Sequence, residues 1–170
     1  MSKIASNILI DRGCKSLKEI CQSPRIEAES VLAKVLRINR IDLYKEIFDV
    51  HKNQENLFFS LIKLRSEGMP MAYILGKKDF WTISLEVNEN VLIPRPESEH
   101  LVERALRNLP NINNNYNILE LGTGSGAIAI SIAKERPCSS IIATDISLEA
   151  LSLAQSNALR NKAININFMA

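Results

Sequence analysis

The stretch "LELGTGSGAIAIS" (residues 119–131) decides the fold of the C-terminal half of this 170-residue chain. An apolar run ends at Gly122, and Gly124 and Gly126 precede a second apolar run. Glycines at such a junction let the chain turn sharply and let a ligand approach the backbone where a Cβ would collide. Amide groups at the start of the next helix then point at that ligand. The pattern therefore predicts a buried strand, a ligand-binding loop and a helix in succession.

Strand patterns and helical patterns alternate along the chain after this loop. Outward from it, we expect a helix over residues 125–136, a strand over 140–146, a helix over 147–160 and a strand over 164–170. This alternation is typical of parallel strands joined by crossover helices. The predicted fold class is α/β, with the first three strands of an incomplete parallel sheet.

The N-terminal part of the chain shows helical periodicity instead. Ser23 as an N-cap and Pro24 at the first helical position predict the start of one helix. A second helix is predicted over "NQENLFFSLIKLRSEG" (53–68), where Gly68 suits the position just after the helix end. Apolar residues at helical spacing throughout this part predict a small helical bundle.

The periodicity changes after the second of these helices. Two clusters of aromatic or β-branched residues flank the turn signal "NEN" (88–90), so we predict a β-hairpin from about Phe80 to Ile93. Phe80 and Trp81 are expected to pack this hairpin against a domain. Pro96 then begins the helix that leads to the first parallel strand.

Composition and charge argue against several classes of protein. A formal net charge of +2 argues against a broad phosphate-binding face, so no direct binding to nucleic acid is expected. No run is long and apolar enough to span a bilayer, and the N-terminus lacks the apolar core of a secretory signal. The three cysteines show no CxxC spacing, so we expect reduced thiols, no metal site and a cytoplasmic location.

An acidic residue completes the candidate ligand site. Asp145 ends the second predicted strand, 21 residues after Gly124, where a carboxylate can accept hydrogen bonds from the two hydroxyls of a ribose. Gly122, Gly124 and Ala127 also satisfy the dinucleotide fingerprint G-x-G-x-x-G/A, so an NAD(P)-dependent oxidoreductase is one alternative, and a glycine turn without a ligand is another. The candidate cofactor-binding residues are Glu120, Gly122, Thr123, Gly124, Ser125, Gly126 and Asp145.

The form E-x-G-x-G-x-G, with Glu120 two residues before the first glycine, resembles motif I of class I S-adenosylmethionine-dependent methyltransferases. That resemblance implies that Glu120 lies near the charged methionine end of the cofactor. Three segments together resemble the HemK-type methyltransferases, which methylate the side-chain amide of a glutamine in peptide chain release factors. These segments are "EGMPMAYILGKKDFW" (67–81), "LIPRPESE" (92–99) and "LELGTGSGAIAIS" (119–131).

The resemblance covers essentially the whole chain and implies a domain organisation. Residues 1–75 correspond to a helical substrate-recognition domain, 76–95 to a β-hairpin linker, and 96–170 to part of a Rossmann-like domain that binds S-adenosylmethionine. The implied cofactor is S-adenosyl-L-methionine, and the implied protein partners are release factors, with a monomeric enzyme and no membrane. Glu97 and Ser98 stand where the family usually has Asp and Thr, which keeps the functional groups.

One motif of the family is absent from this sequence. The Asn-Pro-Pro-Tyr motif, expected to hold the target amide, does not occur in it. We therefore expect the N-terminal part of a longer enzyme, with no catalytic residue in this chain. Such a part should bind S-adenosylmethionine weakly and transfer no methyl group by itself. His51 and His100 are expected to be solvated rather than catalytic.

Arg95 is a second candidate site residue. Its neighbours Pro94 and Pro96 favour an extended backbone, which suits two residues, Pro94 and Arg95, that line a cleft. A surface salt bridge from Arg95 to Glu97 or Glu99 is the alternative.

Two other functions remain open at this stage. A nucleic-acid adenine amino methyltransferase would use related chemistry on an amino nitrogen, although the near-neutral charge argues against it. A non-enzymatic module, whose helical part docks a partner without catalysis, is the other.

Overall fold

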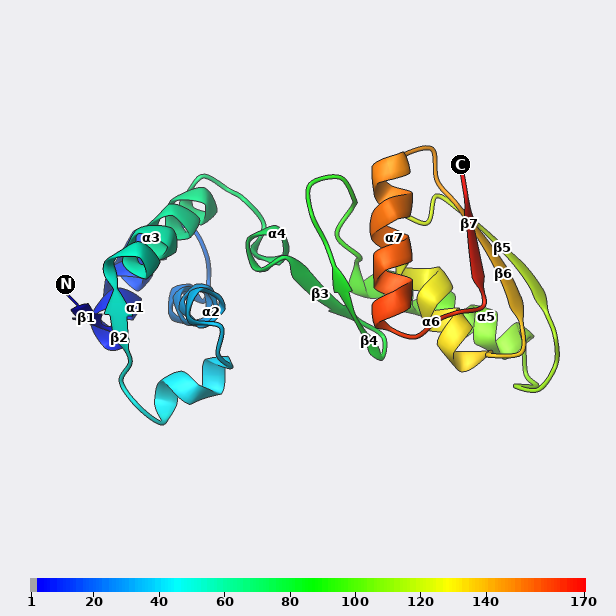
Figure 1. Ribbon diagram of the computed structural model, residues 1–170, viewed down its shortest axis with the longest axis horizontal. Coiled ribbons are helices and arrows are strands. Elements are labelled where there is room, and N and C mark those ends of the chain that lie inside the picture. The colour runs from blue at the N-terminus through cyan, green and yellow to red at the C-terminus, as the bar shows by residue number, and fades with distance from the viewer. Residues whose placement is uncertain (1–2) are drawn as a thin grey trace. The chain divides into compact units, whose positions relative to one another are not determined.

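The computed structural model describes residues 3–170, which form two compact units that meet at Leu75 and Gly76 (Figure 1). Each unit has its own apolar core. No helix within residues 3–170 is long and apolar enough to cross a membrane.

The first unit is a helical bundle with one small strand pair. Leu9, Leu32 and Phe58 are fully buried in its core, on three different helices. Its elements in chain order are β1 (Lys3–Ala5), α1 (Ser6–Leu17), α2 (Pro24–Leu36), the 3-10 helix η1 (Arg40–Tyr44), β2 (Asp49–His51), α3 (Lys52–Ser66) and α4 (Met71–Leu75).

The strand pair of this unit corrects the purely helical prediction. β1 and β2 pair antiparallel, with Ile4 opposite Val50, and Val50 is completely buried. Strands of three residues carry too few positions for an alternating pattern, so periodicity does not reveal them. The two predicted helices are confirmed as α2 and α3. Pro24 is the first residue of α2, while Ser23 precedes it without a side-chain capping bond.

The second unit has a β-hairpin and a three-stranded parallel sheet whose strands alternate with helices along the chain. Its elements are β3 (Lys77–Phe80), β4 (Ile83–Glu86), the 3-10 helix η2 (Pro96–Ser98), α5 (Glu99–Asn108), β5 (Asn117–Leu121), α6 (Ala127–Glu135), β6 (Ser140–Thr144), α7 (Leu148–Arg160) and β7 (Ile166–Met169). The strands β5, β6 and β7 pair parallel in that order, which confirms the predicted α/β class.

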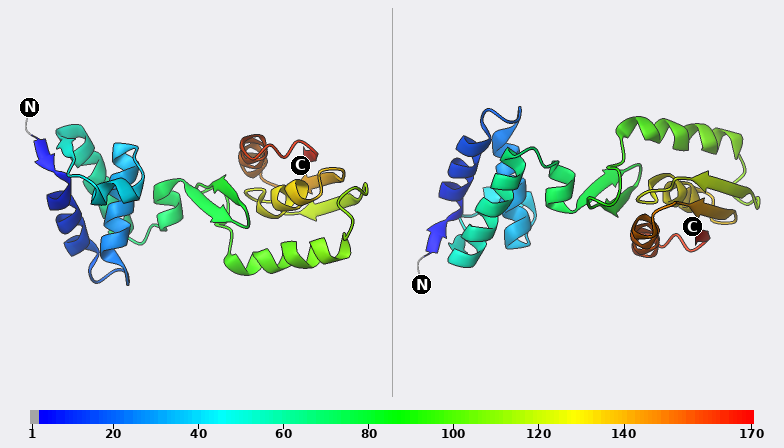
Figure 2. Two further views of the ribbon diagram at one scale, coloured as in Figure 1. Left: turned by 90° about the horizontal axis from the view of Figure 1, so that it is seen from below. Right: turned by 90° about the horizontal axis from the view of Figure 1, so that it is seen from above.

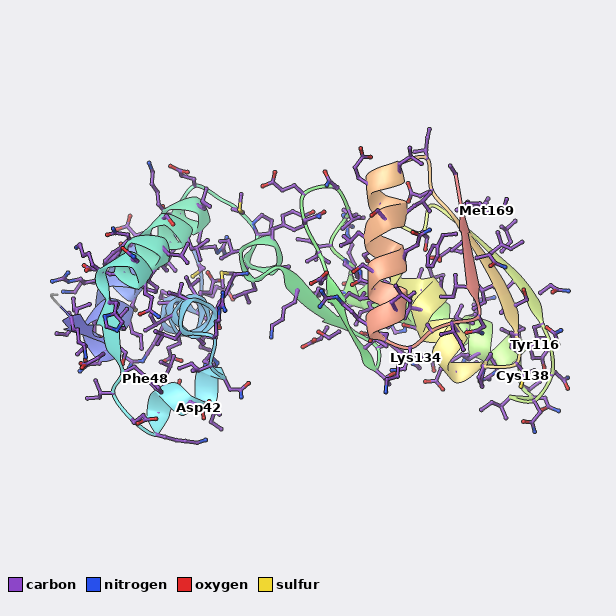
Figure 3. All side chains as sticks on the ribbon, in the orientation of Figure 1. Asp42, Phe48, Tyr116, Lys134, Cys138 and Met169 are labelled. Carbon is purple, nitrogen blue, oxygen red and sulfur yellow. The ribbon has the colours of Figure 1, made fainter. Side chains whose placement is uncertain are left out.

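Helices α5, α6 and α7 pack on the same face of this sheet. α6 lies between the other two in both views of Figure 2. Small side chains make this close packing possible, since many buried positions of the unit's core are alanines on α6, β6 and α7. Met169 lies at the carboxyl end of the sheet, and Tyr116 and Cys138 lie at the opposite end (Figure 3).

The prediction that the first parallel strand is buried is wrong for one of its faces. Leu119 and Leu121 of β5 are 63% and 75% exposed, on the face opposite the helices. Ile142 and Met169, from the neighbouring strands, are exposed on the same face. An apolar run shows that a strand is hydrophobic, but it does not show what covers each face.

The predicted position of the hairpin is also wrong. The hairpin spans Lys77 to Glu86, and its turn consists of Trp81 and Thr82 rather than the "NEN" segment. Trp81 has a φ of 53°, a left-handed conformation that bulky residues rarely adopt. The turn therefore lacks the glycine or asparagine that would have marked it in the sequence. Phe80 and Trp81 do pack into the core of this unit, as predicted.

Candidate functional site

The glycine-rich loop lies at the carboxyl end of β5. Gly122, Gly124 and Gly126 all have positive φ, at 71°, 55° and 82°. A Cβ added at Gly122 or Gly124 would meet no atom within 4 Å, whereas one at Gly126 would lie 2.8 Å from Cδ1 of Ile130. Backbone conformation thus favours glycine at all three positions, and packing also demands it at the third. The space beside the first two glycines is open.

Asp145 lies beside this loop because β5 and β6 are parallel neighbours, so that their carboxyl ends share one edge. Its Oδ2 accepts a hydrogen bond from the Gly124 N–H at 2.8 Å. Its Oδ1 accepts one from the Ser147 N–H at 3.0 Å, at the start of α7. The structure therefore brings the predicted carboxylate to the predicted glycine loop.

Glu120 lies on the helix-covered face of the sheet. Its Oε2 accepts hydrogen bonds from Oγ1 of Thr123 at 2.7 Å and from the Ala129 N–H at 3.1 Å. Within residues 3–170, Oε1 of Glu120 takes part in no hydrogen bond. Burial raises the pKa of this carboxyl, the two hydrogen bonds lower it, and the charge of Asp145 raises it further; the net shift is upward. Glu120 thus ties the loop to α6 with one oxygen, and its other oxygen accepts no hydrogen bond from residues 3–170.

A cavity of about 160 Å³ separates the loop from the segment that follows the hairpin. Pro94 is buried in its wall, and Arg95 is exposed at its edge. The glycine loop and the first turn of α6 form one wall, and the segment before α5 forms the other. The lining residues are Leu92, Ile93, Pro94, Arg95, Ser98, Glu120, Gly122, Thr123, Gly124, Ser125, Ala127 and Ile128.

The acidic residues near Arg95 do not pair with it. Among residues 3–170, Arg95 forms no ion pair, so the alternative of a salt bridge to Glu97 or Glu99 is not what the structure shows. Glu99 instead accepts a hydrogen bond from the Trp81 N–H at 2.8 Å. The Trp81 indole N–H donates to Glu135 at 3.0 Å. These two bonds fix the strained hairpin turn to α5 and α6.

Sequence reasoning missed Asn157 on α7. Its side chain is completely buried and bonds to Ser125 of the glycine loop and to Glu86 at the end of β4. A polar residue among the alanines on the inner face of "ALSLAQSNALR" was the signal that could have found it.

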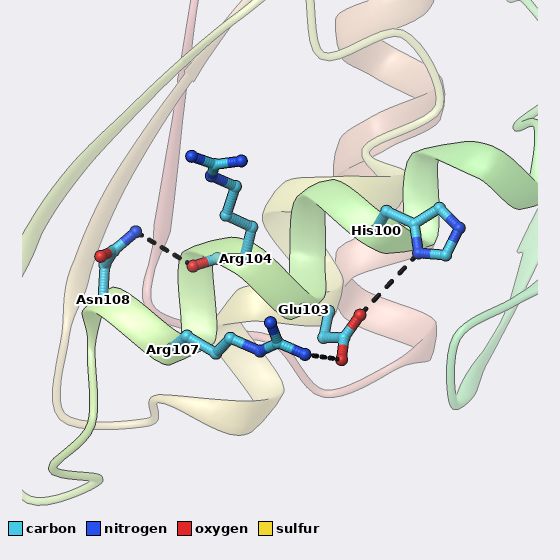
Figure 4. A pocket seen from close by; sticks show the side chains of 5 residues that line it. All are labelled: His100, Glu103, Arg104, Arg107 and Asn108. Atoms are coloured by element: carbon cyan, nitrogen blue, oxygen red, sulfur yellow. Dashed lines mark hydrogen bonds and ion pairs between the residues drawn. The ribbon is translucent and has the colours of Figure 1, made fainter.

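A larger hollow, of about 400 Å³, lies along the outer side of α5 (Figure 4). His100, with a side chain 82% exposed, and Arg107 both face Glu103 there. Exposed side chains of one helix that pair with one another do not converge on a common point, so this hollow has the character of a solvated surface. Within residues 3–170, no group of three His, Cys, Asp or Glu side chains could hold a metal ion.

Comparison with known proteins fits this arrangement. Residues 9–76 match the family described as PrmC N-terminal domain, and residues 112–170 match the family described as methyltransferase domain. The chain thus pairs a helical unit similar to the PrmC N-terminal domain with an α/β unit similar to a methyltransferase domain.

Curated relatives are more specific. The chain is 46% identical to the release factor glutamine methyltransferase of Coxiella burnetii, over 91% of this chain and 56% of that protein. It is 42% identical to the protein of that name from Rhodopirellula baltica, over 82% of this chain and 49% of that protein. Over most of its length the chain is similar to release factor glutamine methyltransferases, and it spans about half the length of these relatives.

Solved structures add nothing to this assignment. A precorrin-6y C5,15-methyltransferase from Geobacter metallireducens superimposes with a TM-score of 0.41 and 16% identity, over 50% of this chain and 43% of that one. A similarity of this degree carries no argument about the site.

Proposed function

We propose that this protein transfers a methyl group from S-adenosyl-L-methionine to the side-chain amide nitrogen of a glutamine in a peptide chain release factor. Similarity to the release factor glutamine methyltransferases supports the activity and the protein substrate. The second unit would bind the cofactor, and the first unit would recognise the release factor.

Glu120 is the observation that carries the choice of cofactor. A carboxylate in the wall of the cavity, with one oxygen that no other group of residues 3–170 engages, favours a ligand with a positive charge at that point. The methionine end of S-adenosylmethionine carries such charges. The pyrophosphate of a dinucleotide is an anion and would be repelled by the same carboxylate, so the site argues against an oxidoreductase.

Each of the other predicted residues has a role in this proposal. Gly122 and Gly124 leave open space where a ligand can approach the backbone. Each oxygen of Asp145 accepts one backbone hydrogen bond, from Gly124 or Ser147, and has a second lone pair that could accept one from a ribose hydroxyl. Thr123, Ser125 and Gly126 hold the loop in shape, and Pro94 and Arg95 form the facing wall.

Methyl transfer from a sulfonium requires the protein to position the two reactants, and it does not require a strong base. The cofactor, when bound, supplies an electrophilic methyl group. An amide nitrogen is a poor nucleophile because its lone pair is delocalised into the carbonyl group. The protein therefore contributes alignment and hydrogen bonds. We further propose that the protein acts as a cytoplasmic monomer, without direct contact to nucleic acid or membrane.

The cofactor assignment is tested by two titrations followed by calorimetry. S-adenosylhomocysteine and NADH are added separately to the protein, and we expect heat of binding from the first alone. Binding of NADH without binding of S-adenosylhomocysteine would overturn the assignment.

The substrate is tested by transfer of a radiolabelled methyl group to a release factor. The control is the same release factor with its target glutamine changed to alanine. We expect the whole enzyme to label the release factor and not its alanine variant, and the 170-residue chain, which contains no Asn-Pro-Pro-Tyr motif, to bind the cofactor product but to label neither. Transfer to both release factors alike would contradict the proposed target.

A further inference from the structure

One buried amide bonds both to the glycine loop in one wall of the cavity and to Glu86, which precedes the segment that forms the other wall. The Nδ2 of Asn157 donates hydrogen bonds to the Ser125 carbonyl at 2.9 Å and to the Glu86 carbonyl at 3.0 Å. Its Oδ1 accepts a hydrogen bond from the Glu86 N–H at 2.7 Å. The side chain is 0% exposed. A single side chain on α7 therefore bonds to the backbone of two segments that are far apart in the sequence.

We propose that Asn157 is a positioning residue for cofactor binding, because it fixes the glycine loop and the segment that leads to the facing wall in one arrangement. The inference rests on the proposed function of this cavity. Asn157 itself does not line the cavity, so it would act through Ser125 and Glu86.

The glycine loop needs such an anchor. Gly124 and Gly126 lose more conformational freedom on ordering than other residues, so a loop that contains them is costly to hold still. Three of its amides are already engaged: the Thr123 N–H donates to the Thr144 carbonyl at 2.8 Å, the Gly124 N–H to Asp145, and the Gly126 N–H to the Thr123 carbonyl at 2.9 Å. The bond from Asn157 fixes a carbonyl, at the one buried residue between the two glycines. A loop ordered before the ligand arrives binds more tightly than one ordered by it.

The facing wall starts from the same amide. Both backbone groups of Glu86 bond to Asn157. The chain then passes through the buried Val87 and Val91 to Pro94 in the cavity wall. Loss of Asn157 would therefore free the backbone of Glu86, from which the chain leads to one wall, and the Ser125 carbonyl in the other wall.

A neighbouring asparagine offers a matched control. Asn161, one turn later at the C-cap of α7, donates to the Ser84 carbonyl at 3.0 Å and to the Asn157 carbonyl at 2.9 Å. It thus ties α7 to the same strand, β4, without a bond to the glycine loop. A merely structural role in attaching the hairpin would be shared by both asparagines, and a role in the loop would belong to Asn157 alone.

The test compares Asn157→Ser with Asn161→Ser in the full chain. Hydrogen–deuterium exchange is followed on the peptide that covers residues 122–128, without ligand, and affinity for S-adenosylhomocysteine is measured by calorimetry. We expect Asn157→Ser to speed exchange in that peptide and to weaken binding by about tenfold, which corresponds to ~1.4 kcal/mol for lost hydrogen bonds. Asn161→Ser should leave the exchange unchanged and the affinity within about twofold.

Equal effects of the two variants, or unchanged exchange in Asn157→Ser, would overturn the inference. If Asn157→Ser does not fold, Asn157→Thr, whose extra methyl group leaves less empty volume than serine does, takes its place. Absence of binding by the unsubstituted protein would refute the proposed cofactor instead, and the exchange experiment would still decide whether Asn157 holds the loop.

Discussion

The two units of the chain both bury polar side chains, but they use them differently. In the first unit, Glu29 is 2% exposed and accepts hydrogen bonds from Arg25, Arg40 and Tyr44. In the second unit, the partly buried Glu120 and the fully buried Asn157 bond largely to backbone groups around a cavity. Side chains pair with the charge of Glu29 in the first unit, whereas the bonds of Glu120 and Asn157 hold the glycine loop in the second.

This difference indicates which buried polar groups serve a site. The partners of Glu29 come from α2 and η1, so the cluster attaches the 3-10 helix to the bundle. Both oxygens of Glu29 are engaged by side chains, and nothing is left for a ligand. Glu120 lines a cavity, and within residues 3–170 one of its oxygens accepts no hydrogen bond. A buried carboxylate is thus a functional candidate when its own chain leaves it incomplete.

The largest effect on stability is expected for Glu29→Ala. The substitution removes three hydrogen bonds and leaves a void beside two arginines, although both reach solvent, with side chains 60% and 43% exposed. We expect a loss of about 2–3 kcal/mol in the free energy of unfolding. Urea unfolding followed by circular dichroism measures it.

Two controls make this result specific. Asp49→Ala breaks a surface pair with Lys3 whose side chains are 66% and 49% exposed, and it should cost less than about 0.5 kcal/mol. Trp81, the single tryptophan of the chain, lies in the second unit and reports on that unit by fluorescence. A change in the affinity for S-adenosylhomocysteine in Glu29→Ala would show that the contrast between the two units is wrong.

Within the second unit, Gly124→Ala and Gly126→Ala should separate binding from folding. Alanine at Gly124 adds a Cβ in open space at a φ of 55°, so it should cost about 1 kcal/mol of stability and lower the affinity for S-adenosylhomocysteine by at least about tenfold. Alanine at Gly126 must also displace Ile130, and it should cost about 2 kcal/mol. Calorimetry and thermal unfolding of both variants test this order. Unchanged affinity in Gly124→Ala would argue that no ligand approaches the loop there.

The parts of the fold that sequence reasoning could reach were those with local signals. Periodicity, glycines or Pro24 within about a dozen residues predict each of these elements: the glycine loop, the parallel strands, α2 and α3. The position of Asp145 followed from the parallel order of two strands. The binding role of these residues stays a prediction, since geometry alone does not test it.

The parts that could not be predicted depend on contacts between distant residues. The pairing of Ile4 with Val50 joins two strands too short to show a pattern. The turn at Trp81 is held in a left-handed conformation by Glu99, 18 residues later. Asn157 matters because of Ser125, 32 residues earlier. In each case the contact joins residues that are far apart in the sequence, so only the tertiary fold shows which residue is the partner.

The smallest effect on affinity is expected for Glu120→Gln, which separates the charge of this side chain from its hydrogen bonds. The new carbonyl oxygen can still accept hydrogen bonds from Thr123 and Ala129, while the charge is lost. Burial raises the pKa of Glu120 above its unfolded value, so the folded state holds this proton more strongly. Proton binding by Glu120 therefore stabilises the folded wild-type protein at low pH. That stabilisation is lost as the pH rises from below the unfolded pKa through the folded pKa, and the glutamine variant has no such loss. Relative to wild type, Glu120→Gln should become more stable as the pH rises from acidic to neutral, as measured by unfolding at several pH values.

The affinity of Glu120→Gln for S-adenosylmethionine should nevertheless fall by about fivefold, because the carboxylate proposed to face the cationic end of the cofactor is gone. A variant that is more stable and also binds as tightly as wild type would show that the buried charge of Glu120 does not serve the cofactor.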